Sequence, residues 1–271
     1  MMTRHAQPTS QTVKWSWDGA DVSCAITRYG TGPSALLLPA LSSISSREEM
    51  WPLQKHLADH FETVVPDWPG FGNRGKPVLD WTPNTMTAWL DHLLRTVVSR
   101  PALVIASGHA AGFVVRHFAA KPDEAPDVVL VAPTWRGPLP TMIGRRPVWL
   151  GHVRAAVDNK VVGPLLYALN LNRFVISRMA KGHVYSDPAS LTSARLRNMR
   201  HVARAKGARF ASVRFVTGAL DPYLSGDAFC ADAETIPSDR LRLIWGDETP
   251  RKSKAEMVKL AETTGITPDV L

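Results

Sequence analysis

Apolar and polar positions alternate near the start of the chain and then gather in short runs. Residues 13–17 and 22–29 show the period of two that is typical of half-buried strands, and Asp18 and Gly19 between them favour a hairpin turn. Later runs are mostly apolar, as expected for strands buried on both faces, and they span residues 35–38, 63–65, 102–106, 128–131 and 241–245.

Segments with helical spacing separate these runs, at residues 46–57, 85–98, 112–120 and 253–262. Alternating strands and helices predict an α/β fold with a mostly parallel sheet and helices on both faces. Residues 136–214 interrupt the alternation with a helix-rich, amphipathic stretch. We therefore expect a core made of residues 1–135 and 215–271, with residues 136–214 inserted as a helical lid.

The composition fits one folded domain without a targeting segment. The chain has 271 residues, 45% of them hydrophobic, which is enough for a substantial core. No apolar run reaches about 18 residues and the first ten residues hold no apolar stretch, so neither a membrane span nor a secretory signal is expected. The two cysteines, Cys24 and Cys230, favour a reducing, cytoplasmic location.

Positive charge is concentrated in the predicted lid. The net charge is +8, and residues 136–214 alone hold 15 Lys and Arg but two acidic residues. This pattern fits a solvated basic face, or attraction of anionic substrates or of anionic lipid headgroups in peripheral contact with a membrane. No nucleic-acid-binding motif is present, so no nucleic acid partner is expected.

A strand, a tight turn and a helix follow one another around residue 110. The apolar run 102–107 leads into Gly108-His109-Ala110-Ala111-Gly112. Glycines two residues either side of a centre are typical of a nucleophile elbow, whose central residue has a strained backbone. The motif resembles the G-x-S-x-G elbow of the α/β-hydrolase superfamily. A nucleotide-binding loop is disfavoured, because neither G-x-G-x-x-G nor G-K-[ST] occurs.

Four further segments resemble the same superfamily in the same order, between residues 22 and 262. They are the oxyanion-hole segment 38–41, the D-x-P-G-x-G loop at 66–72, the strand end at 130–133, and the strand before the acid at 243–246. The resemblance implies an α/β-hydrolase fold and hydrolysis of carboxylic esters or similar bonds.

The catalytic positions depart from that pattern. Ala110 stands where the resemblance places the nucleophilic serine, either naturally or through an engineered Ser-to-Ala change, so no acyl-enzyme is expected there. The acid position falls on Thr249, with Asp247 and Glu248 as neighbours that could replace it. A second G-x-x-D-P pattern ends at Asp221, which we interpret first as a turn residue and second as an acid.

The base is expected to be absent, because the last histidine of the sequence is His201. Only nine residues follow Glu262, so the final strand and its histidine loop should be missing or barely begun. Either the chain is a fragment or the protein ends short at Leu271.

Binding features of the family are nevertheless expected to survive. The oxyanion hole needs backbone N–H groups, which Leu41 and Ala111 could supply. Side chains at strand ends are candidates for substrate binding, with core packing as the alternative, and these are Trp68, Phe71, His109 and Trp135.

The predicted lid offers two further candidate surfaces. One is an arginine stripe for anionic groups, or a solvated face, formed by Arg195, Arg197, Arg200 and Arg204. The other is an apolar lining for an acyl chain, or core packing, formed by Leu165, Leu166, Leu169 and Val175.

Three functions fit these observations. The first is a member without the usual serine chemistry that binds a small apolar or anionic ligand. The second is a working hydrolase, using water or an unexpected residue such as His109 with Asp247 or Glu248. The third is a protein whose lid docks on a membrane or an acidic partner. No cofactor or metal is implied, since no His, Asp and Glu cluster has ligand spacing.

Overall fold

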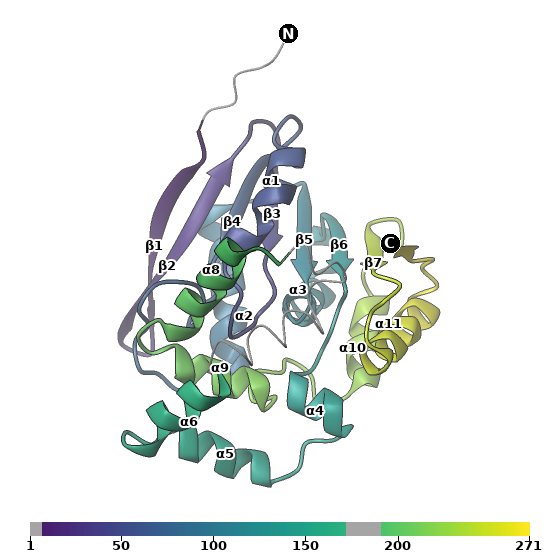
Figure 1. The fold of residues 1–271 in the computed structure, drawn as a ribbon. Coiled ribbons are helices and arrows are strands. Elements are labelled where there is room, and N and C mark those ends of the chain that lie inside the picture. Colours follow the sequence, from purple (N-terminus) through teal and green to yellow (C-terminus); the bar gives the residue numbers. More distant parts are fainter. Residues whose placement is uncertain (1–6, 172–190) are drawn as a thin grey trace.

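One mixed sheet organises the computed structural model, which describes residues 7–171 and 191–271 (Figure 1). The strand order is β1-β2-β4-β3-β5-β6-β7-β8. β1 and β2 pair antiparallel, as do β2 and β4, and all later neighbours are parallel. The strands are β1 (Thr9–Trp17), β2 (Ala20–Tyr29), β3 (Ser34–Leu38), β4 (Glu62–Pro66), β5 (Leu103–Ser107), β6 (Asp127–Val131), β7 (Leu241–Trp245) and β8 (Asp269–Val270).

The turn of the predicted hairpin lies where the sequence places it. Asp18 (φ 50°) and Gly19 (φ 72°) are both left-handed, as a two-residue turn between twisted strands requires, and Trp17 pairs with Ala20. At the other edge, β8 has two residues, with Asp269 opposite Ile244 of β7.

Helices cover both faces of the sheet, because successive strand residues face opposite sides. On β3, Ala35 and Leu37 join the cluster that α1 covers, whereas Leu36 and Leu38 join the larger cluster on the other side. The second face carries α2, α3, α10 and α11. The bounds are η1 (Arg47–Met50), α1 (Trp51–Leu57), α2 (Pro83–His92), η2 (Leu93–Val97), α3 (Ala110–Ala119), η3 (Pro122–Glu124), α10 (Gly226–Glu234) and α11 (Arg251–Thr264). The predicted α/β fold is confirmed.

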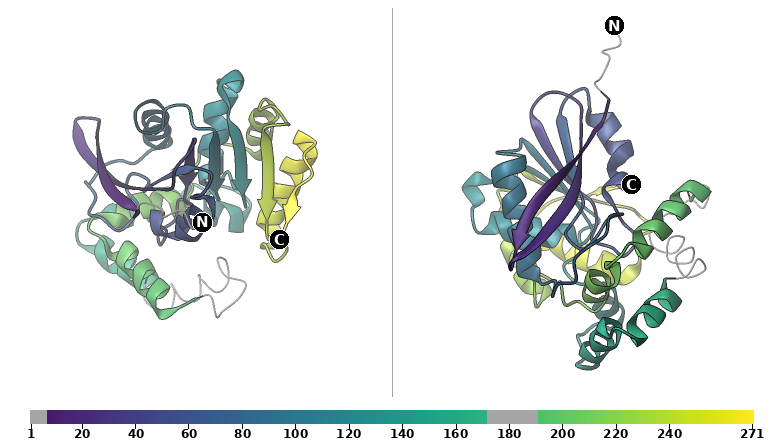
Figure 2. Two further views of the ribbon diagram at one scale, coloured as in Figure 1. Left: turned by 90° about the horizontal axis from the view of Figure 1, so that it is seen from above. Right: turned by 90° about the vertical axis from the view of Figure 1, so that its left-hand side faces the viewer.

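Between β6 and α10, the described chain is helical, as predicted for residues 136–214. The helices are α4 (Pro138–Ile143), α5 (Trp149–Asp158), α6 (Val162–Asn170), α8 (Ser193–Arg204) and α9 (Ala208–Val216). Helices α4, α5, α6 and α9 gather at one end of the molecule (Figures 1 and 2). The last of them extends past the predicted boundary at residue 214. Val175 lies outside the described residues.

Candidate active site

The turn after β5 has its left-handed residue at Gly108. Gly108 has φ +55°, whereas His109 is already helical (φ −67°, ψ −20°) and α3 begins at Ala110. Backbone hydrogen bonds fix the turn, because the Gly108 N–H donates to Val131 O (2.8 Å) and the Gly108 carbonyl accepts from the N–H of Thr134 (3.1 Å). Gly108 therefore takes the left-handed backbone that an elbow requires at its apex, and a glycine takes it without strain.

This geometry corrects the expectation that Ala110 is the apex. Ala110 is fully buried as the first residue of α3. A Cβ atom on Gly108 would instead lie 3.3 Å from the Cβ of Ala40, on the loop after β3. A side chain at 108 would thus face the loop after β3, whereas the side chain of Ala110 is enclosed at the start of α3.

The shift of the apex also changes the expected oxyanion hole. In an elbow, one donor is the N–H of the residue after the apex, and a second comes from the loop after β3. His109 follows the apex, and within residues 7–171 and 191–271 the N–H groups of His109 and Leu41 make no hydrogen bond. The N–H of Ala111 donates to Gly108 O at 3.1 Å, so it is already used inside the turn. Leu41 stays a candidate donor, and His109 replaces Ala111.

A carboxylate that the sequence did not single out lies on the same loop. The Ala40 N–H donates to Glu49 Oε1 at 3.0 Å. The Glu49 side chain is exposed, so water reaches part of it. The neighbouring protein still raises its pKa to about 7 by desolvation, against hydrogen bonds from Ser45 and Ala40. Glu49 is therefore a carboxylate with a raised pKa beside the candidate oxyanion hole.

The His109 ring points away from solvent into a buried polar cluster. Its Nε2 lies 3.4 Å from Asp221 Oδ1, and its faces meet Phe113 and Phe215. Burial lowers the pKa of His109 to about 4, so the ring is neutral at pH 7. The ring packs against the two phenylalanines, and its Nε2 lies 3.5 Å from the Leu220 carbonyl oxygen, so it does not face an open pocket.

Asp221 is the centre of that cluster and more than the turn residue we expected. Its Oδ2 accepts from Arg146 Nη2 (2.6 Å) and Nε (3.1 Å), and its Oδ1 accepts the Gly137 N–H (2.7 Å). Burial raises the pKa of Asp221, and the Arg146 guanidinium opposes this. The cluster joins the insert to the elbow, since Arg146 lies between α4 and α5.

The loop after β7 does not reach this cluster. Asp247 is exposed and pairs with Lys254 at 2.7 Å, which lowers its pKa. Its N–H donates to Leu271 O, and the N–H of Thr249 donates back to Gly246 O. Glu248 is exposed. None of the three candidate acids has a hydrogen bond or ion pair to the elbow among the described residues.

The aromatic candidates are buried packing residues. Trp68 is fully buried and donates its indole N–H to Pro39 O at 2.9 Å, so it supports the oxyanion loop from behind. Phe71 packs edge-on against Phe215, and Trp135 lies under the guanidinium groups of Arg136 and Arg146.

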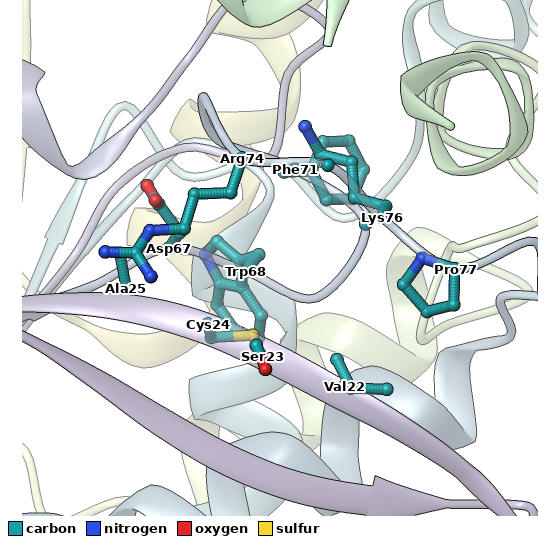
Figure 3. Close-up of a pocket in the computed structure, with 12 residues that line it drawn as sticks. Val22, Ser23, Cys24, Ala25, Asp67, Trp68, Phe71, Arg74, Lys76 and Pro77 are labelled. Atoms are coloured by element: carbon teal, nitrogen blue, oxygen red, sulfur yellow. The ribbon is translucent and has the colours of Figure 1, made fainter. Parts of the chain in front are cut away.

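A small cavity lies beside the loop after β4. Its volume is about 10 Å³, the room of one water molecule, and Cys24, Asp67, Arg74 and Lys76 contribute to its wall (Figure 3). Asp67 is buried in an ion pair with Arg47 (2.7 Å). Burial lowers the pKa of Lys76 to about 8, and its ammonium donates to Gly72 O at 2.6 Å.

Comparison with known proteins decides the family. The model of the alpha/beta hydrolase family matches residues 35–266. This chain belongs to that family. No curated protein gives a significant match to this α/β-hydrolase. Across the part of the chain that the structure describes, no group of three or more His, Cys, Asp or Glu could hold a metal ion, and no helix there is long and apolar enough to cross a membrane.

Solved structures with the same fold are distant in sequence. An alpha/beta hydrolase from Sphaerobacter thermophilus is 20% identical, with a TM-score of 0.64 over 96% of this chain and 92% of that one. A thermophilic esterase from Thermogutta terrifontis is 19% identical, with a TM-score of 0.66 over 96% and 89%. A hydrolase from Pseudomonas aeruginosa is 14% identical, with a TM-score of 0.68 over 96% and 89%.

The candidate site thus has a glycine at the turn, two N–H groups that make no hydrogen bond to the described residues, and one carboxylate with a raised pKa. The sequence signals for Gly108 and Glu49 were present but ambiguous. Gly108 stood out only as a flanking glycine, and Glu49 only as an acid in the first turn of a helix.

Proposed function

We propose that this α/β-hydrolase binds a small carbonyl compound at the turn around Gly108 and forms no acyl-enzyme with it. The observation that carries the proposal is the glycine at the apex. The family's covalent chemistry needs a nucleophilic side chain at that position, and glycine has none. Backbone donors do not depend on that side chain, so the capacity to bind a carbonyl oxygen is retained without the chemistry.

The ionisation of Glu49 determines whether a neutral or an anionic ligand is favoured. Its pKa is about 7, so the carboxylate beside the loop is mostly ionised above neutral pH. A negative charge there repels an anionic ligand and leaves a neutral carbonyl unaffected. An ester or amide carbonyl is therefore the preferred ligand above pH 7, and a carboxylate should bind more weakly as the pH rises through about 7.

Butanamide is a suitable probe because it has a neutral carbonyl and resists hydrolysis. We expect it to shift the backbone amide resonances of Leu41 and His109 in a protein-observed NMR titration. Two variants isolate the His109 N–H. Both H109A and H109P remove the ring, but H109P alone removes the N–H, and proline fits the φ of −67° at this position.

H109P should weaken butanamide binding about two- to tenfold relative to H109A, which is the effect of losing one hydrogen bond. Equal affinities of the two variants, or shifts that avoid both loops, would refute the proposal. Circular dichroism of both variants confirms that the fold is retained.

A second candidate function is favoured by Glu49 itself. The ionised carboxylate can take a proton from a water molecule, whose oxygen attacks an ester carbonyl held at the two N–H groups. The C–O bond of the ester then breaks, and the alcohol leaves with the proton that Glu49 carried. This route needs no nucleophilic side chain.

Hydrolysis of p-nitrophenyl esters separates the two candidates. Direct water attack predicts turnover that rises with pH through about 7 and falls about 100-fold in E49Q, within the range of general-base effects. E48Q is the matched control, because Glu48 is also exposed but accepts its hydrogen bond from the Asn73 side chain instead of from the Ala40 N–H. No turnover above a heat-denatured sample leaves binding as the function.

A further inference from the structure

Helix α6 exposes an apolar face that nothing in the proposed function uses. No charged residue occurs from position 161 to position 171. Val161 is 86% exposed and Leu165 is 61% exposed, and Val162 between them is exposed as well. These positions recur at i, i+1 and i+4, so they share one side of the helix. A helix of a folded domain normally turns such a face toward the core.

The neighbouring helices also carry exposed apolar side chains. The α5 helix packs directly on α6, and α4 lies at the same end of the molecule (Figures 1 and 2). Exposed apolar side chains stand at the end of α4 and the start of α5, with Val148 88% exposed. We call the following set the apolar lid surface: Met142, Val148, Trp149, Val161, Val162 and Leu165.

The charge around this surface has one sign. Residues 136–171 and 191–216 contain twelve Lys and Arg and a single acidic residue, Asp158. Asp158 is already paired with Arg214 at 2.9 Å. Arg145 and Lys160 are exposed at the ends of α4 and α5. A partner that binds this surface must therefore present an apolar region with negative charge next to that region.

We propose that the apolar lid surface docks on a bilayer that contains anionic lipids. The apolar side chains enter the boundary between headgroups and acyl chains, while Arg145 and Lys160 contact the lipid phosphates. Trp149 is the residue type that favours this boundary. An acidic protein would also need an apolar surface that fits these side chains, whereas an anionic bilayer supplies apolar chains and negative charge from the same lipids.

The helical segment that carries this surface also reaches the candidate site. Phe215 of α9 contacts the His109 ring, so the insert touches the elbow directly. The inference does not depend on the proposed function, because it rests on the outer surface of the insert alone.

Co-sedimentation with vesicles tests the proposal. We expect binding to vesicles of phosphatidylcholine mixed with phosphatidylserine, and at least about tenfold weaker binding to phosphatidylcholine alone or in high salt. The variant V161S/L165S should lose at least about tenfold in affinity for the mixed vesicles. V78S is the matched control, because Val78 is 69% exposed in a loop of the core.

The two basic residues are tested separately with R145E/K160E, which should also weaken binding to mixed vesicles. All substituted side chains are exposed, so circular dichroism should show an unchanged fold. Equal binding to neutral and mixed vesicles, or equal binding by V161S/L165S and V78S, would overturn the proposal. A concentration-dependent dimer that V161S/L165S abolishes, with no vesicle binding, would overturn it in favour of self-association.

Discussion

At the scale of single residues, the absence of a side chain at Gly108 determines what the site can do. The G108S variant should place a hydroxyl beside the loop at Ala40, where the new Cβ would lie 3.3 Å from the Ala40 Cβ, so the loop must yield by a few tenths of an ångström. We expect p-nitrophenyl butyrate to acylate this variant once per chain, seen as a single-turnover burst and by intact mass. The left-handed backbone with a serine side chain should cost about 1–3 kcal/mol of stability.

The A110S variant is the matched control for this experiment. It adds the same hydroxyl to the first residue of α3, where it is buried and faces no open site. We expect neither acylation nor a burst from A110S or from the unaltered chain. Acylation of A110S but not of G108S would return the apex to residue 110.

The sequence alone could locate this turn but not its centre. Glycines at 108 and 112 are placed symmetrically about Ala110, and the spacing does not say which of the residues 108–110 takes the positive φ. The choice depends on where β5 ends and α3 begins, and element ends are the least certain part of a sequence-based prediction. Glu49 was missed for a related reason, because only the folded loop brings Ala40 N–H to its carboxylate.

At the scale of elements, apolar patterning predicted the buried strands well. The runs at 35–38, 102–106 and 128–131 became β3, β5 and β6, because a strand buried on both faces must be apolar at nearly every position. The cluster of His109, Asp221 and Arg146 could not be predicted in this way. Its members are far apart in sequence and meet only through tertiary packing.

The loop after β4 offers a stability test at the same scale. Gly72 has φ +78°, and a Cβ there would collide with the carboxylate of Asp67, which is held by Arg47. G72A should therefore lower the free energy of unfolding by at least about 1 kcal/mol. G75A is the control, because a Cβ at Gly75 meets only Lys206 Cβ at 3.8 Å. Urea denaturation of both variants measures the difference, and equal losses would contradict the explanation.

At the scale of the whole molecule, the insert and the core differ in charge and in attachment. The core buries two large apolar clusters, whereas α6 packs mainly on α5 and exposes an apolar face. Two described links join the insert to the elbow: the aromatic contact of Phe215 with His109, and a polar link through Arg146 and Asp221. Arg146 also donates to Tyr223 O (2.7 Å) and Leu224 O (3.3 Å), so one guanidinium ties the α4–α5 segment to the chain before α10.

Removing that guanidinium should loosen the insert before it unfolds the core. R146A leaves the Asp221 carboxylate buried without its cation, a loss that costs about 3–5 kcal/mol for a fully buried pair and less here, where Arg146 is 27% exposed. We expect hydrogen exchange to accelerate in α4 and α5, while amides of β5 and β6 keep their protection at low denaturant. R145A is the control, because Arg145 is the exposed neighbour and its removal should change neither region. The opposite result would be equal acceleration of exchange in α5 and β5 by R146A. The insert and the core would then open as one cooperative unit, and the polar link would stabilise the whole molecule rather than the insert alone.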